Sequence, residues 1–434
     1  MSRPPSVDQL ARSLDGSGLP HPLAVEVART VIADDRVDEA DAVARERRRR
    51  MLTPVVNATG VLLHTNLGRA PVEHAVSAGY ANLELDLATG KRGSRQKAVG
   101  DLLAAACGAE AAMVVNNCAS AVLLALAAMG PDGPVAVSRG ELVEIGGAFR
   151  VPDVMAQSGA ALIEVGTTNR TRPADYGNAI DTMGAATLLK VHQSNYKIVG
   201  FTEEATVRQL AGLDAPVLAD IGSGLLDAAC PWLDGPPPTW LADEPAARQT
   251  LADGADLVMF SGDKLFGGPQ AGIIAGSAEL VGRCSRHPLA RALRPGGLVL
   301  SALQATTLAY LRRDGQAIPF WRMASAPVDG LRARSAAIAS RLASDGRVAA
   351  VDTEAVPGGG TLPTVTMPSA GLHVEGDHTE ALRQRDVPVI ARVDEGTTVL
   401  DLRTVDPDHD EELIAALHEV LADPSGSGGE RPDR

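Results

Sequence analysis

Residues 255–272 read ADLVMFSGDKLFGGPQAG, an apolar run followed by a lysine and then by paired glycines. The run from Asp256 to Phe260 is typical of a buried strand, and Lys264 follows it on a tight turn. Ser261 is placed to hold a phosphate oxygen, and the glycines let the backbone approach a flat ring. The pattern therefore predicts a lysine that forms a Schiff base, although a surface lysine in a Gly-rich loop would give the same local pattern.

Length and composition indicate a large globular enzyme. The chain has 434 residues, of which 45% are hydrophobic and 3% aromatic, so its core is built mainly from aliphatic side chains. It has no apolar run of about 18 residues, and Met1–Pro22 lacks the apolar stretch of a signal peptide, so we expect a cytoplasmic protein without a membrane partner. The four cysteines lie far apart, which indicates buried thiols and neither a zinc site nor a disulfide framework.

Charge limits the nucleic-acid partners that are plausible. The net charge of -14 argues against nonspecific binding to nucleic acid, and we expect no DNA partner. Residues 1–50 differ from the rest, because nine arginines balance nine acids there and the segment ends in the basic run RERRRR at 45–50. Such a run is either a solvated helix face or linker, or a contact surface for RNA, and the run alone does not decide between them.

The order of sequence patterns predicts an α/β protein in three parts with a tail. Residues 1–55 form a small helical N-terminal module, 56–310 a large domain of parallel strands with helical crossovers, and 311–422 a smaller α+β C-terminal domain. Residues 423–434 are rich in Gly, Ser, Pro and charge, so we expect them to be disordered.

The individual elements are predicted from periodicity and turn residues. Helices are expected at 7–14, 23–32, 302–311 and 411–421. Strands are expected at 112–115, 135–137, 188–191, 217–219 and 257–260 in the large domain, and at 364–367 and 398–402 in the smaller one.

Two further segments complete a cofactor pattern with Lys264. Asn117, Cys118 and Ala119 follow an apolar strand and open a helix, whose free amides favour a phosphate group, although a plain helix cap explains the same residues. Asp220 ends another strand 44 residues before Lys264, where a carboxylate can keep a pyridine nitrogen protonated. Phosphate loop, aspartate and lysine in this order resemble the large domain of fold-type I pyridoxal-phosphate enzymes.

Longer motifs narrow the resemblance to a single family of these enzymes. They are NATGVLLHTNLGRA at 57–70, GKRGSR at 90–95, SRGELVEIGGAFR at 138–150, EVGTTNR at 164–170, and His192 with SNY at 194–196. With these motifs the chain, from its N-terminal module to about residue 404, resembles the bacterial selenocysteine synthases. It departs from their usual pattern at Pro295–Leu298 and Gln193, and at Phe266, where leucine is typical.

The resemblance implies an activity and its partners. Such an enzyme converts seryl-tRNA(Sec) to selenocysteinyl-tRNA(Sec) with pyridoxal 5'-phosphate as cofactor and selenophosphate as selenium donor. Water is eliminated to leave an aminoacrylyl-tRNA, to which selenium is then added. The resemblance further implies that the N-terminal module recognises the tRNA and that the chain assembles from dimers into a homodecamer.

Site residues follow from the same resemblance. Lys264 holds the cofactor and then acts as general base, Asp220 keeps the ring nitrogen protonated, and Asp263 orients water or the donor. His192 lies on or near the cofactor, or is a structural hydrogen-bonding residue. The arginines that bind the donor anion correspond to Arg69, Arg291 and Arg294, which could otherwise be surface ion-pair residues.

Two other functions fit parts of this pattern. A related family of ammonia lyases acts on small amino-sugar acids with the same cofactor, but it has little need of a helical module with an arginine run. A tRNA-binding protein on an inactive scaffold would have no use for both Lys264 and Asp220, so the sequence favours the transferase.

Overall fold

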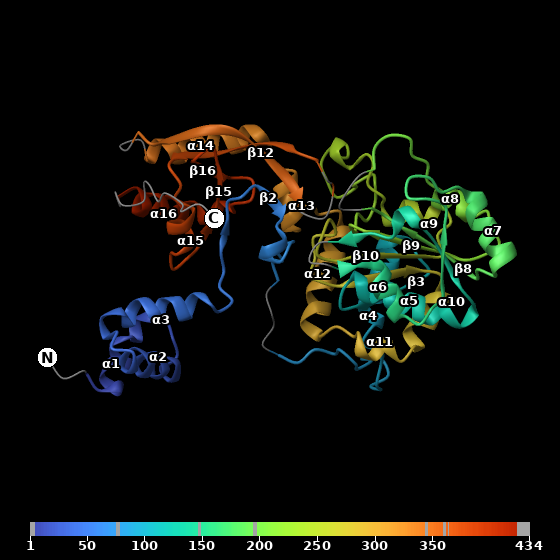
Figure 1. The fold of residues 1–434 in the computed structure, drawn as a ribbon, viewed down its shortest axis with the longest axis horizontal. Helices are drawn as coiled ribbons and strands as arrows, with labels where there is room; N and C mark the ends of the chain where they lie inside the picture. The colour runs from blue at the N-terminus through green and yellow to red at the C-terminus, as the bar shows by residue number, and fades with distance from the viewer. Residues whose placement is uncertain are drawn as a thin grey trace. The chain divides into compact units, whose positions relative to one another are not determined.

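The computed structural model describes residues 5–74, 79–145, 149–193, 198–342, 346–358, 362 and 364–422 of the chain (Figure 1). The chain divides into two compact units. One comprises Met1–Gly60, Leu331–Thr353 and Ala370–Arg434, and the other, the larger, comprises Val61–Gly330 and Glu354–Ser369.

The larger unit is built on a seven-stranded sheet in the order β3-β11-β10-β9-β8-β4-β7. The strands are β3 (Ala111–Val115), β4 (Val135–Ser138), β7 (Leu162–Val165), β8 (Thr187–Val191), β9 (Val217–Gly222), β10 (Leu257–Ser261) and β11 (Gly272–Gly276). Strands β10, β9, β8, β4 and β7 pair in parallel, whereas β11 is antiparallel to both of its neighbours. The carboxyl ends of the parallel strands therefore meet at one edge of the sheet, where α/β folds bind their ligands.

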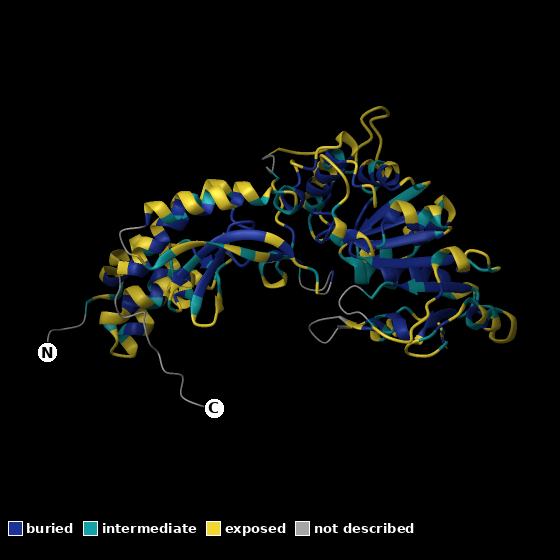
Figure 2. Ribbon diagram, turned by 90° about the horizontal axis from the view of Figure 1, so that it is seen from above, coloured by how far each residue is buried: buried dark blue, intermediate teal, exposed yellow. Residues whose placement is uncertain are grey.

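Helices cover both faces of this sheet. Met113 and Val115 share a buried cluster with α5 and α10, whereas the alternate residue Val114 shares one with α4 and α12. In Figure 2 the strands of the sheet are coloured as buried, and the exposed residues lie on the outward faces of the helices. The helices of this unit are α4 (Lys97–Cys107), α5 (Cys118–Met129), α6 (Val151–Gln157), α7 (Pro173–Met183), α8 (Val207–Leu210), α9 (Ala247–Ala252), α10 (Ala278–Arg286), α11 (Leu289–Ala292), α12 (Gly297–Arg312) and α13 (Pro319–Ala324).

The five strands predicted for the large domain are confirmed, as is the α/β class with its sheet between helices. The prediction of parallel strands omitted β11. Only ten residues separate β10 from β11, which is too short for a helical crossover, so the chain returns antiparallel to β10.

The other unit combines three N-terminal helices with strands and helices from the C-terminal part. The helices α1 (Val7–Ser13), α2 (His21–Ala33) and α3 (Ala40–Arg49) enclose a core of their own. The basic run occupies the second half of α3, from Arg45 to Arg49, and its cap, Arg50. The C-terminal elements are α14 (Val328–Arg341), β12 (Val348–Gly358), β13 (Met367–Glu375), α15 (Thr379–Arg383), β14 (Val389–Ile390), β15 (Arg392–Asp394), β16 (Thr397–Asp401) and α16 (Asp410–Ala422). The start of α14, the end of β12 and the start of β13 belong to the larger unit.

Most predictions for this unit are confirmed, including the first two helices, β16 and α16. The strand expected at 364–367 is wrong, because β13 begins only at Met367 and Thr364 lies in a turn with a φ of 67°. Short strands complete the structure: β1 (Val56–Asn57) pairs with β14, β2 (Val61–Leu63) with the end of β12, and β5 (Glu144–Ile145) with β6 (Phe149–Arg150).

Other predictions concern boundaries and termini. The division at residues 55, 310 and 422 stays a prediction. The proposed tail at 423–434, the Gly146–Ala148 part of one motif and the SNY motif at 194–196 lie outside the described residues. Among the helices that are described, none is both long enough and apolar enough to cross a membrane.

Candidate active site

Lys264 lies on the turn that joins β10 to β11. The turn is closed by backbone hydrogen bonds from Gly262 N to Ala271 O and from Gly267 N to Lys264 O, both of 2.8 Å. Its glycines are required, since a Cβ at Gly262 would lie 2.7 Å from a carbonyl oxygen and Gly267 has a φ of 70°. Lys264 itself is only 7% exposed, so the surface-lysine alternative is wrong.

Aromatic side chains support this turn from within the core. The Tyr310 hydroxyl donates to Phe266 O at 2.8 Å and accepts from Trp321 Nε1 at 2.6 Å. The ring of Tyr310 also packs against those of Trp232 and Phe266, with centroids 4.6 and 5.0 Å apart. A rigid apolar support thus fixes the residues that directly follow Lys264.

Asp220 lies near the carboxyl end of β9, the strand beside β10. Its Oδ1 accepts hydrogen bonds from Gly222 N at 3.0 Å and from the Cys118 thiol at 3.3 Å. Burial raises the pKa of Asp220, and the hydrogen bond from Cys118 and the positive charge of Lys264 oppose that rise. The structure therefore brings Asp220, Cys118 and Lys264 together at one edge of the sheet.

Cys118 begins α5, the helix after β3. Asn117 caps this helix, because its Oδ1 accepts from Ser120 N at 2.8 Å. Burial raises the pKa of the Cys118 thiol well above its ordinary value, and the charge of Asp220 acts in the same direction. The thiol is thus directed at Asp220, and a phosphate group at this helix end would be bound by the first main-chain amides, which have no acceptor within the helix.

Arg69 reaches the Lys264 turn from a distant part of the sequence. Its Nη1 lies 2.9 Å from Asp263 Oδ2, and Ala70 N donates to Asp263 O at 3.1 Å. Arg69 has a φ of 64°, a conformation that directs the chain back toward the turn. Its Nε is buried and has no hydrogen-bond partner among the described residues. The geometry therefore pairs Arg69 with Asp263 next to Lys264.

Comparison with known proteins gives the chain its family. The profile of the L-seryl-tRNA selenium transferases matches residues 55–406. The L-seryl-tRNA(Sec) selenium transferase of Geobacter sulfurreducens is 45% identical to it over 90% of this chain and 88% of that protein. The chain belongs to the L-seryl-tRNA selenium transferase family.

Another family member matches over nearly the whole chain, and one solved structure shares the fold. The Moorella thermoacetica enzyme is 42% identical, with 96% of each chain covered. The structure of D-glucosaminate-6-phosphate ammonia-lyase matches with a TM-score of 0.58 and 20% identity, over 86% of this chain and 96% of that one. At that identity the likeness shows a common fold and nothing about substrate. The fold-type I assignment is confirmed.

The selenium transferase family depends on pyridoxal phosphate, and the described residues fit that group. A buried lysine and a buried carboxylate lie at adjacent strand ends, and a helix N-terminus adjoins them. Ser223, whose carbonyl accepts from Leu265 N at 2.8 Å, has a buried hydroxyl with no hydrogen-bond partner among the described residues. Such an orphaned hydroxyl beside the Lys264 turn is consistent with a ligand that brings its own polar atoms.

His192 directly follows β8 and contacts Asp220 through its backbone. Its N–H donates to Asp220 O at 2.8 Å, and its Nε2 lies 3.6 Å from Glu244 Oε2. The Glu244 side chain is 3% exposed, and its Oε1 has no hydrogen-bond partner within the described part of the chain. We did not predict Glu244, because a single acid in a loop carries no local signal. Ser261 is buried at the end of β10, where its hydroxyl opposes the rise in the pKa of the Cys118 thiol.

Arg291 and Arg294, the other two arginines expected to bind the donor, differ in their surroundings. Arg294 contacts Glu84 at 3.3 Å, and Glu84 also pairs with Arg92 and Arg95, whose hydrogen bonds lower its pKa. Arg291 is exposed on α11. The ion-pair alternative is therefore observed for Arg294, while donor binding by both residues stays a prediction.

Proposed function

We propose that this selenium transferase uses Lys264 and Asp220 as its central catalytic residues. The family's reaction converts seryl-tRNA(Sec) to selenocysteinyl-tRNA(Sec), with pyridoxal phosphate as cofactor. The observation that supports the residue assignment is the pairing of a buried lysine with a buried carboxylate at the ends of adjacent strands. The positive charge of Lys264 opposes the rise that burial causes in the pKa of Asp220.

The cofactor supplies an electron-withdrawing ring, which makes the Cα proton of the seryl group acidic and lets its β-hydroxyl leave. Lys264 would hold the cofactor through Nζ and would accept the Cα proton of the seryl group at the same atom. Asp220 would hold a proton at the ring nitrogen. Cys118 and Gly222 both bind Asp220 Oδ1, so Oδ2 is the oxygen left for that task.

We assign the remaining contacts with the cofactor to five residues. Asn117, Cys118 and Ala119 offer the start of α5 to its phosphate, and Ser261 adds a hydroxyl at the end of β10. His192 limits the movement of the ring beside Asp220.

Arg69, Arg291 and Arg294 are our proposed binding residues for selenophosphate. Arg69 has the strongest support, because its pair with Asp263 leaves the buried Nε without a partner. A planar guanidinium with a spare donor suits a phosphate oxygen. Asp263 then orients Arg69 and the donor relative to Lys264.

The tRNA is proposed to contact the helices of residues 1–55. The basic run leaves Arg45, Arg47, Arg49 and Arg50 exposed, and exposed arginines bind RNA by backbone charge and shape. We also propose a homo-oligomer, a homodecamer built from dimers, in the cytoplasm. The exposed apolar side chains of Tyr80 and Leu87 support burial against another copy.

The test of the function incubates the purified, cofactor-loaded protein with serine-labelled seryl-tRNA(Sec), with and without selenophosphate. Selenocysteine recovered on deacylation only when the donor is present is the expected result. Unchanged serine, together with elimination on a free amino-sugar acid, would assign the chain to lyase chemistry instead.

A further inference from the structure

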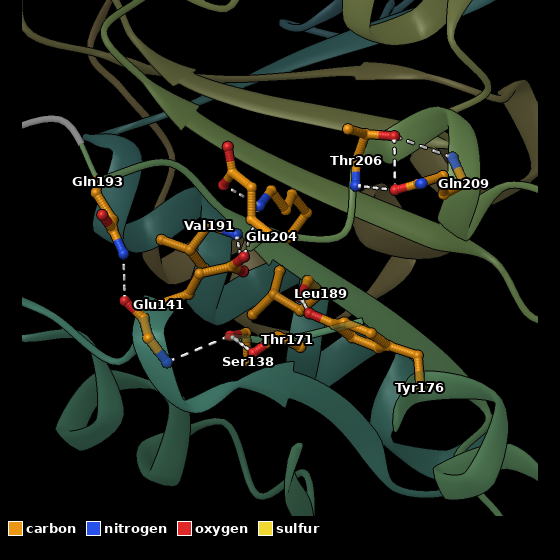
Figure 3. A network of polar contacts seen from close by, with 12 residues as sticks. Ser138, Glu141, Thr171, Tyr176, Leu189, Val191, Gln193, Glu204, Thr206 and Gln209 are labelled. Carbon is orange, nitrogen blue, oxygen red and sulfur yellow. Dashed lines mark hydrogen bonds and ion pairs between the residues drawn. The ribbon is translucent and has the colours of Figure 1, made fainter. Parts of the chain in front are cut away.

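A buried ion pair at the end of β8 has no part in the chemistry above. Glu141 Oε1 lies 2.6 Å from Lys190 Nζ, and the two side chains are only 6% and 15% exposed (Figure 3). Burial lowers the pKa of Lys190, but the carboxylates of Glu141 and Glu204 outweigh it and the pKa ends above its ordinary value. Lys190 therefore remains charged next to the active-site edge.

Glu141 also supplies a hydrogen-bond acceptor that a neighbouring strand would otherwise provide. The pairs between β4 and β8 end at Val137 and Leu189, because the chain leaves β4 for a turn at Arg139–Glu141. Val191 N then has no partner on β4 and donates to Glu141 Oε2 at 2.8 Å. The carboxylate thus holds the end of β8 from the side that the sheet leaves open.

The turn that carries Glu141 is fixed in its own place. A Cβ at Gly140 would lie 2.5 Å from Thr168 O, so the turn packs closely on the 164–170 motif. Gly140 O accepts a hydrogen bond from Gln193 Nε2, which holds the chain just after His192. Contacts at Lys190, Val191 and Gln193 therefore bracket His192. We call these contacts, made by Gly140 and Glu141, the β8 clamp.

The β8 clamp reaches Asp220 through the sheet. On its other side β8 stays paired with β9 up to Val191 and Asp220, and His192 N continues this pairing with its bond to Asp220 O. A shift of the end of β8 would therefore move both His192 and Asp220.

We propose that Glu141 is a positioning residue of the active site, which sets the place of His192 and Asp220 relative to the cofactor. A buried ion pair is weak evidence for a gain in stability, since a packed apolar pair often serves as well. The charge at this place is instead explained by the two acceptors that one carboxylate offers to Lys190 and Val191. The inference rests on the proposed role of Asp220.

The experiment compares Glu141→Leu and Glu141→Gln in the full-length protein. Leucine removes both acceptors, whereas glutamine keeps an oxygen for Val191 N–H. Readouts are the visible circular dichroism of the bound cofactor, its dissociation constant and the melting temperature. We expect Glu141→Leu to change the dichroic band and weaken cofactor binding by about tenfold, as loss of an orienting contact does elsewhere, and Glu141→Gln to retain most of both.

The matched control is Asp410→Leu, which breaks the ion pair of Asp410 with Arg334 in the other unit. It should lower the melting temperature and leave the dichroic band unchanged. If Glu141→Leu does the same, Glu141 is only structural and the proposal is overturned.

Two further variants cover the remaining outcomes. Gln193→Ala replaces Glu141→Leu if the latter does not fold, because it removes one contact of the β8 clamp without leaving a buried charge unpaired. An unchanged dichroic band in Gln193→Ala then overturns the proposal.

Asp220→Ala tests the underlying role of Asp220. If it leaves the band unchanged while Glu141→Leu alters it, the assignment of Asp220 fails and not the positioning by Glu141.

Discussion

The Lys264 turn and the end of β8 border the same edge of the sheet, yet they are supported by opposite means. Below the turn lie seven of the chain's twelve aromatic side chains: Trp232, Trp240, Phe260, Phe266, Tyr310, Phe320 and Trp321. The end of β8 is held by the carboxylate of Glu141 and the ammonium group of Lys190.

The difference fits the chemistry assigned to each place. The aromatic cluster fixes the Lys264 turn from within the core without adding a charge beside the lysine. At β8 the charges of Glu141 and Lys190 pair with each other. They position the main chain of His192, whose N–H donates to the main-chain oxygen of Asp220, so that this hydrogen bond involves no charged group. Aromatic packing thus supports the Lys264 turn from the core, although Asp263 on that turn also pairs with Arg69, whereas at β8 an ion pair is the main support.

Loss of Lys264 should have the largest effect. We expect Lys264→Ala to abolish selenium transfer and the visible absorption of the bound cofactor, because no other described group occupies its place on the turn. Absorption spectra and single-turnover assays measure both. A variant that keeps turnover and chromophore would refute the assignment.

Asp220→Asn should come next. It keeps the shape of the side chain but removes the charge that holds a proton at the ring nitrogen, so we expect kcat to fall by about 10²- to 10⁴-fold. Single-turnover kinetics with saturating seryl-tRNA(Sec) measure the loss. A decrease below threefold would mean that the ring is activated by another group.

Tyr310→Phe tests the aromatic support. It leaves Phe266 O and Trp321 Nε1 without their partner, at an expected cost of about 1–3 kcal/mol in the free energy of unfolding. We also expect slower covalent capture of the cofactor by Lys264, which stopped-flow absorbance records.

Its control is Tyr176→Phe, another buried tyrosine, whose hydroxyl contacts Leu189 O at 3.3 Å. This change should lower stability and leave the capture rate at Lys264 unaltered. Equal slowing in both variants would show that the aromatic cluster has no particular link to the turn.

Cys118 should give the smallest change. Cys118→Ala removes one of the two donors to Asp220 Oδ1, worth about 0.5–1.5 kcal/mol, so we expect cofactor affinity to fall by about two- to tenfold. Cys118→Ser keeps a donor and should restore most of it. Fluorescence titration with pyridoxal phosphate measures both, and identical affinities for alanine and serine would contradict the role given to the thiol.

What the sequence predicted was mainly local. The turn of Lys264, the strand before it and the helix after Asn117 each follow from adjacent residues, so their patterns were sufficient. The association of Asp220 with Lys264 was expected from the order of phosphate loop, aspartate and lysine, which resembles that of fold-type I enzymes.

What the sequence did not predict depends on contacts between distant residues. Glu141 and Lys190 are separated by 49 positions, and Cys118 and Asp220 by 102. No periodicity in the sequence marks such pairs, and none marks the contact of Glu84 with Arg294. Glu244 was missed for the same reason, since its burial next to His192 arises only in the folded chain.

The most direct test of the central claim is borohydride reduction of the cofactor-loaded protein, followed by peptide mass spectrometry. The account predicts one pyridoxyl group, on Lys264, in the peptide that follows β10. A pyridoxyl group on another lysine, or none in a protein that still transfers selenium, would contradict it.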